Sequence, residues 1–112
     1  MPTLLEFTAA GSPVPLSRAI EDYAREQGQV SAIVVPWESD GGALSMAVTS
    51  VKTDGWAIEH TNLGTIRVTG LPGDRSRVVV DAADPEHPEK ARLARVLAGF
   101  AEGLQARLSA SS

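Results

Sequence analysis

The stretch that decides the fold is Lys90–Leu108, KARLARVLAGFAEGLQARL. Apolar side chains recur in it every three or four residues, which is the period of an α-helix. They form one stripe, thickened by Val96 and Ala101: Leu93, Leu97, Phe100, Leu104 and Leu108. Because a helix with such a stripe must bury it against another layer, the stretch predicts a long C-terminal helix lying on a sheet.

Two glycines, Gly99 and Gly103, lie in the same helix, on one line with Val96 at the border of the stripe. Each costs about 1 kcal/mol relative to alanine in a helix interior. Two interpretations remain open. Either the helix backbone closely approaches the sheet or a second copy of the helix, or the missing side chains leave volume for a ligand.

The sheet is predicted by three further glycines, Gly55, Gly64 and Gly73, which are spaced nine residues apart. We interpret each as the last residue of a three-residue hairpin loop, where a left-handed conformation is needed. The loops are Thr53-Asp54-Gly55, Asn62-Leu63-Gly64 and Leu71-Pro72-Gly73. Six-residue strands between such loops make an antiparallel meander.

This register places Glu59 opposite Arg67 and Arg67 opposite Arg77 on the outer face of the sheet. It also places Trp56 opposite Gly70, so that a large ring covers a bare backbone. The inner face then carries His60 and the apolar residues Leu44, Met46, Val48, Ile58, Ile66, Val68, Val78 and Val80.

The N-terminal part of the chain predicts three more elements. Thr3–Thr8 alternates weakly, as a strand does, and an amphipathic helix follows from Pro15 to a stop at Gly28. Val30–Val35 is a short β-branched strand. We therefore predict an α+β domain with the order β-α-β5-α, in which the antiparallel sheet wraps around the C-terminal helix.

Composition excludes several classes of function. The chain has 112 residues, a formal charge of −4 and no cysteine. An acidic chain without a clustered basic face argues against a nucleic-acid partner. No disulfide or cysteine-ligated metal is available, and no apolar run approaches the roughly 20 residues of a membrane span. Since no signal peptide is recognisable, we expect a single cytoplasmic domain, residues 1–112, with no membrane partner.

No catalytic motif accompanies this architecture. The sequence lacks the nucleophile-elbow, dinucleotide-binding and P-loop patterns, and neither histidine has two further metal ligands at a suitable spacing. We therefore predict no cofactor, no metal and no catalytic residue, and we do not expect an enzyme. A cyclase or hydrolase activity would need an acid–base pair that we do not find.

His60 and Trp37 are candidates for a binding site. On the inner face, His60 would orient a ligand in an apolar pocket through one hydrogen bond. Its structural alternative is a histidine near a strand end, bonded to a backbone carbonyl or to water. Trp37 follows a strand, where it would line the mouth of a pocket, pack at a sheet edge or form a subunit contact.

Two charged clusters also have a functional and a structural interpretation. His87 and the acidic residues of segment 84–89 would hold a cation, or else begin the C-terminal helix by complementing its dipole. Arg67, Arg75 and Arg77 would meet an anion, or else form the solvated outer face of the sheet.

The order of these elements resembles the helix-grip fold of START-like, polyketide-cyclase-like (SRPBCC) proteins. The matching segments are EFTAAGSPVPLSRAIEDYA, LSMAVTSVKTDGWAIEH, GTIRVTGLPGDRSRVVVDA and KARLARVLAGFAEGLQARL, which together span most of the chain. The resemblance implies a cavity between the sheet and the long helix that binds a small hydrophobic molecule, and it implies no fixed catalytic residue.

We therefore expect a small hydrophobic ligand between sheet and C-terminal helix, with Met46, Trp56, His60 and Phe100 as its lining. The alternative is a ligand-free interaction module. Because the sheet has open edges, we expect a homodimer, formed through a sheet edge or through the side of the helix that carries the two glycines.

Overall fold

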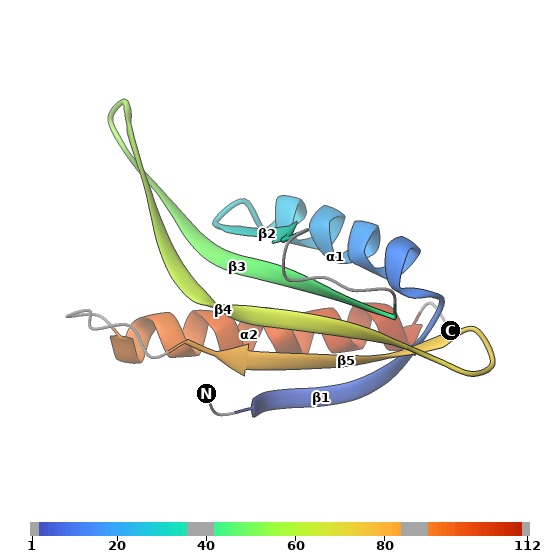
Figure 1. Ribbon diagram of the computed structural model, residues 1–112. Helices are drawn as coiled ribbons and strands as arrows, with labels where there is room; N and C mark the ends of the chain where they lie inside the picture. Colours follow the sequence, from blue (N-terminus) through green and yellow to red (C-terminus); the bar gives the residue numbers. More distant parts are fainter. Residues whose placement is uncertain (1–2, 36–41, 84–89, 111–112) are drawn as a thin grey trace.

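A computed structural model describes residues 3–35, 42–83 and 90–110 of the chain (Figure 1). Within these residues, one five-stranded antiparallel sheet is combined with two helices, one of them C-terminal. The elements are β1 (Thr3–Ala10), α1 (Pro13–Gln27), β2 (Val30–Val34), β3 (Ala43–Asp54), β4 (Ala57–Leu71), β5 (Arg75–Ala82) and α2 (Lys90–Ala110). The predicted α+β class and C-terminal helix are confirmed, whereas four described strands follow α1 in place of the predicted five.

The strands lie in the order β1-β5-β4-β3-β2, so α1 connects the two opposite edges of the sheet. α1 packs on β2, β3 and β4, and α2 packs on β1, β4 and β5. The inward side chains of the strands form one core cluster with both helices, which places both helices on the same face. All five apolar residues of the stripe predicted on α2 are buried in this cluster.

The boundaries of α1 follow from local chemistry. Ser12 is the N-cap and Pro13 occupies the first turn, where its missing N–H costs no hydrogen bond. At the other end Gly28 adopts φ 76° and donates its N–H to the carbonyl of Arg25 at 3.2 Å. The predicted stop at Gly28 is therefore confirmed, and the helix begins two residues before Pro15.

The first predicted hairpin loop is one residue too long and begins two residues too early. Asp54 pairs with Ala57, so the loop between β3 and β4 consists of Gly55 and Trp56. Gly55 has φ 65° at the first loop position, as two-residue hairpins require. Trp56 therefore lies at the tip of the hairpin and does not face Gly70.

The second predicted loop is wrong, because β4 continues through Asn62-Leu63-Gly64 as a strand. Val48 pairs with Gly64 and Thr49 pairs with Asn62, which leaves Leu63 as the extra residue of a β-bulge. Leu63 is buried in the core, and its carbonyl accepts a hydrogen bond from Ala83. Burial of this leucine outweighs the tendency of Asn62-Leu63-Gly64 to turn.

Gly64 is required here for a different reason from the predicted one. A Cβ at this position would clash with the carbonyl oxygen of Asp81 on β5 and lie 3.1 Å from the side chain of Leu97. β4, β5 and α2 therefore approach one another at Gly64 more closely than any side chain permits.

The third loop has the predicted length but begins one residue later. Leu71 pairs with Arg75, so the loop is Pro72-Gly73-Asp74. Gly73 has φ 85° and Asp74 has φ 56°. The left-handed conformation at the third loop position thus falls on an aspartate, one of the few residues with a side chain that tolerate it.

These shifts change the cross-strand pairs on the outer face. Arg67 faces Ser45 and Val79, not Glu59 or Arg77. Glu59 instead faces Lys52 near the end of the hairpin. The predicted pairs of Arg67 with Glu59 and with Arg77 are therefore wrong.

The far end of the β3–β4 hairpin leaves the body of the sheet (Figure 1). Pairing of β4 with β5 begins at Gly64, and pairing of β2 with β3 ends at Ser50. In residues 52–61 the described pairing is consequently between β3 and β4 alone, and we call these residues the arm. The arm carries the exposed Trp56 and Ile58.

Candidate functional site

The four residues predicted to line a ligand do not form one site. Met46 is fully buried and belongs, with the buried Phe100, to the core cluster. Trp56 and His60 lie on the arm, where both are exposed. The structure therefore brings two of the four into the same core and places the other two on a projecting hairpin.

The predicted position of His60 on the inner face is wrong because of the bulge at Leu63. One extra residue in a strand reverses the face on which the side chains beyond the bulge lie, here those on its N-terminal side. His60 consequently pairs with Val51, and Ile58 lies with it on the outer face. Neither side chain points toward α2.

The two glycines of α2 have different surroundings. A Cβ on Gly103 would clash with the hydroxyl of Tyr23 and lie 3.3 Å from its Cζ. A Cβ on Gly99 would meet no atom within 4 Å. Of the two interpretations made from sequence, close approach therefore applies to Gly103, although to a side chain of α1 and not to the sheet, and open space applies to Gly99.

Tyr23 is held in the gap beside Gly103 by several partners. Its ring lies 5.2 Å from that of Phe100, centroid to centroid, and the guanidinium of Arg107 lies 5.3 Å from its centroid. Arg107 in turn contacts a carboxylate oxygen of Glu26 at 2.7 Å. This arrangement joins the C-terminal halves of the two helices and fixes the ring of Phe100.

The open space at Gly99 is part of a groove of about 210 Å³ between α2 and the start of β2. It is lined by Gln27, Gln29, Val30, Arg95, Val96, Gly99 and Phe100. Val30 and Phe100 are buried apolar walls and Val96 is half-buried, whereas Arg95 and both glutamines are exposed at the rim. The groove thus combines an apolar floor with a polar, positively charged rim.

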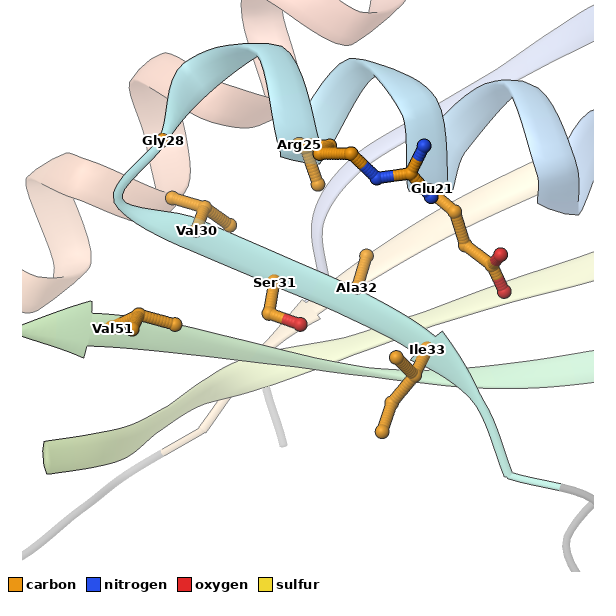
Figure 2. Close-up of a pocket in the computed structure, with 9 residues that line it drawn as sticks. Glu21, Arg25, Gly28, Val30, Ser31, Ala32, Ile33 and Val51 are labelled. Atoms are coloured by element: carbon orange, nitrogen blue, oxygen red, sulfur yellow. The ribbon is translucent and has the colours of Figure 1, made fainter. Parts of the chain in front are cut away.

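A second groove, of about 290 Å³, lies at the free edge of β2 (Figure 2). Residues of α1, of the turn after it, of β2 and of β3 line this groove: Glu21, Ala24, Arg25, Gly28, Val30, Ser31, Ala32, Ile33 and Val51. Glu21 and Arg25 reach over the groove from α1, and Ile33 points to its other side (Figure 2). Ala24, Val30 and Ala32 are its buried apolar walls, and the rest of its lining is exposed or half-buried.

The three arginines of the outer face line neither groove. Arg67, Arg75 and Arg77 are exposed, and Arg77 contacts Glu6 on β1 at 3.4 Å. Among the described residues no three His, Asp or Glu side chains gather to hold a metal ion. His87 with its acidic neighbours, and Trp37, lie outside the described residues.

Sequence reasoning missed most of the groove at Gly99. Phe100 is the one predicted lining residue that it contains. Gly99 is one of the two glycines for which the sequence left a ligand volume open, and Val96 stood out only at the border of the apolar stripe. Gln27, Gln29 and Arg95 carried no signal, because polar residues at helix ends and on helix surfaces are ordinary. Their convergence depends on how α2 crosses the turn between α1 and β2.

No family model, curated protein or solved structure matches this chain. In the portion of the chain that the structure describes, neither helix is both long and apolar enough to cross a membrane.

Proposed function

We propose that this protein binds a small hydrophobic molecule between the sheet and the C-terminal helix, in the groove beside Gly99. The observation that carries the proposal is the open space at Gly99, an exposed position that borders the buried apolar stripe of α2. A glycine in a helix interior is unfavourable, and here no packed neighbour accounts for it. The resemblance to START-like proteins rests on the order of elements and the long C-terminal helix. It supports a ligand site between the sheet and α2.

The lining indicates the chemistry of the ligand. Val30, Val96 and Phe100 would contact an apolar body, and the rim offers the Arg95 guanidinium together with the Gln27 and Gln29 amides. A volume of about 210 Å³ lies below the usual range for drug-sized ligands, roughly 300–1,000 Å³. We therefore propose a short aliphatic or single-ring compound with an anionic head.

The test is a titration of the protein with hexanoate, followed by the backbone amide signals in NMR. Saturable shifts are expected at Val30, Val96, Gly99 and Phe100. Hexylammonium, which has the same apolar chain and the opposite charge, should bind more weakly because of Arg95. Shifts that do not saturate, or that spread evenly over the surface, would contradict the proposal.

A variant that fills the groove, together with a matched control, tests where the ligand binds. Gly99→Leu places a side chain in the open space and should abolish the hexanoate shifts while leaving the protein folded. The control is Ala91→Leu, which adds the same side chain at an exposed position of the same helix and should leave binding unchanged. Equal binding by both variants would place the ligand elsewhere.

A further inference from the structure

The free edge of β2 lacks the features that usually prevent strands from pairing between molecules. β2 is the last strand of the sheet, and its sequence, VSAIV, contains no charge and no proline. Protein edges are normally protected by charged residues, prolines or bulges. The opposite edge strand, β1, has two of these: a register shift between Thr3 and Leu5, and Glu6, which contacts Arg77 at 3.4 Å.

Two hydrogen bonds show which backbone groups of β2 face outward. The carbonyl of Gln29 accepts from the N–H of Val51, and Val35 donates its N–H to the carbonyl of Ser45, both at 2.8 Å. Because successive residues of a strand direct these groups to alternate sides, Val30, Ala32 and Val34 direct theirs to the free edge. Among the described residues, no strand lies on that side of β2.

We infer that this edge pairs with β2 of a second copy of the chain, antiparallel, around a two-fold axis at Ala32. Ala32 would then exchange both hydrogen bonds with the partner's Ala32, and Val30 would do so with the partner's Val34. Every outward N–H and C=O of β2 finds a partner in this register. The product is one continuous sheet across the two copies, with α1 of each on the same face.

The same register also covers exposed apolar surface on the outer face of β2. Ile33 is 58% exposed, although it is a large apolar residue on a strand. Around an axis at Ala32, Ile33 lies opposite the partner's Ser31 in a pair without backbone hydrogen bonds, where side chains approach most closely. Pairing therefore covers an apolar side chain that the monomer leaves in water.

Charge on α1 indicates that the occupant is a second copy and not an unrelated strand. Glu21 and Arg25 line the groove of about 290 Å³ along this edge, one helical turn apart (Figure 2). Around the two-fold axis, α1 of the second copy runs antiparallel to α1 of the first. Glu21 therefore faces the partner's Arg25, and Arg25 faces the partner's Glu21. Arg25 also contacts Asp22 at 3.2 Å, but that pair is exposed and its weak attraction leaves the guanidinium free to turn.

The first experiment measures the mass of the full chain by light scattering from low to high micromolar concentration. We expect a dimer, and we expect hydrogen exchange at the amides of Val30, Ala32 and Val34 to slow as the concentration rises. A monomer throughout the range would overturn the inference. This outcome is independent of the ligand groove, because hexanoate binding is measured on amide signals of either species.

Two variants locate the contact. Ala32→Pro removes an N–H that has no strand partner among the described residues of one copy, and Ile33→Lys places a charge on the free edge; each should give a monomer. Leu4→Lys adds the same charge to the opposite edge strand, at an exposed position, and should remain a dimer. If the Ala32→Pro variant does not fold, the Ile33→Lys variant still tests whether the contact lies at this edge. A dimer with Ile33→Lys would place the contact elsewhere and overturn the inference.

A charge exchange tests the identity of the partner. Glu21→Arg and Arg25→Glu should each raise the dissociation constant of the dimer roughly tenfold, and the double variant should restore it. Glu102→Arg, an exposed charge reversal on α2, should leave the constant unchanged. If the double variant is as weak as the single ones, the two-fold register at Ala32 is wrong.

Discussion

The two parts of β4 show how much the surroundings of a strand matter. Residues 64–69 pair with β3 on one side and β5 on the other, whereas residues 57–61, in the arm, pair only with β3. The same residue type occurs in both: Ile66 has no exposed surface and Ile58 is 64% exposed. The two halves of one strand therefore have similar backbone pairing on the β3 side and opposite burial.

This difference shows that backbone hydrogen bonding and the stability of the fold are separate matters in β4. A ladder exchanges bonds to water for bonds within the protein, so its net contribution is small. Most of the stabilisation comes from apolar burial, which the helices provide only over the body of the sheet. A two-stranded ribbon without such cover is marginal by itself. We therefore expect the arm to add little to the global stability of the fold.

Replacing the two isoleucines tests this directly and should give the largest contrast. Ile66→Ala leaves a cavity in the core and should lower the free energy of unfolding by about 2–5 kcal/mol. Ile58→Ala removes an exposed side chain and should change it by less than about 0.5 kcal/mol. Urea denaturation followed by circular dichroism measures both. Similar losses in the two variants would show that the arm is packed against something in solution.

A second test concerns the junction between body and arm. Gly64→Ala introduces a Cβ that clashes with the Asp81 carbonyl, a backbone group that β4–β5 pairing holds in place, and should cost about 1–3 kcal/mol. Gly70→Ala on the same strand is the control, because its Cβ would find ordinary contacts of 3.5 Å with Pro13. A tolerated Gly64→Ala would show that β4 and β5 separate easily at the junction.

The two glycines of α2 allow a packed position and an open position to be compared within one helix. Gly103→Ala pushes against Tyr23, which should cost about 1–3 kcal/mol and outweigh the roughly 1 kcal/mol gained in helix propensity. Gly99→Ala meets nothing and should stabilise the protein by up to about 1 kcal/mol. The two melting temperatures should therefore move in opposite directions.

A companion variant checks the cause at Gly103. The clash involves the hydroxyl of Tyr23, so Tyr23→Phe combined with Gly103→Ala should lose less stability than the two single effects added together. Strict additivity would mean that the added methyl meets some other group.

The smallest effect is expected at the tip of the arm. Trp56 is 100% exposed, so Trp56→Ser should leave the free energy of unfolding unchanged within about 0.5 kcal/mol. The fluorescence of Trp56, measured in a Trp37→Phe background, should be quenched fully by iodide. Protection from iodide, or a clear fall in stability, would contradict an arm that stands free of the body.

Sequence alone determined the elements whose signals are local or periodic. The apolar stripe from Leu93 to Leu108 predicted a long buried helix, and the glycine at position 28 ended α1 as expected. The alternation of Met46, Val48, Ile66 and Val68 identified the buried face of two strands. These patterns succeed because helix period, strand alternation and capping depend on neighbours a few residues away.

Tertiary structure decided where strands end and which side chains meet. Asn62-Leu63-Gly64 has good turn chemistry, yet the core gains more from burying Leu63 than from a turn there, and the resulting bulge moves His60 to the outer face. Gly99 and Gly103 are equivalent in sequence, but only one lies against Tyr23 of another helix. Such outcomes depend on contacts between segments distant in the chain, for which local propensity carries no information.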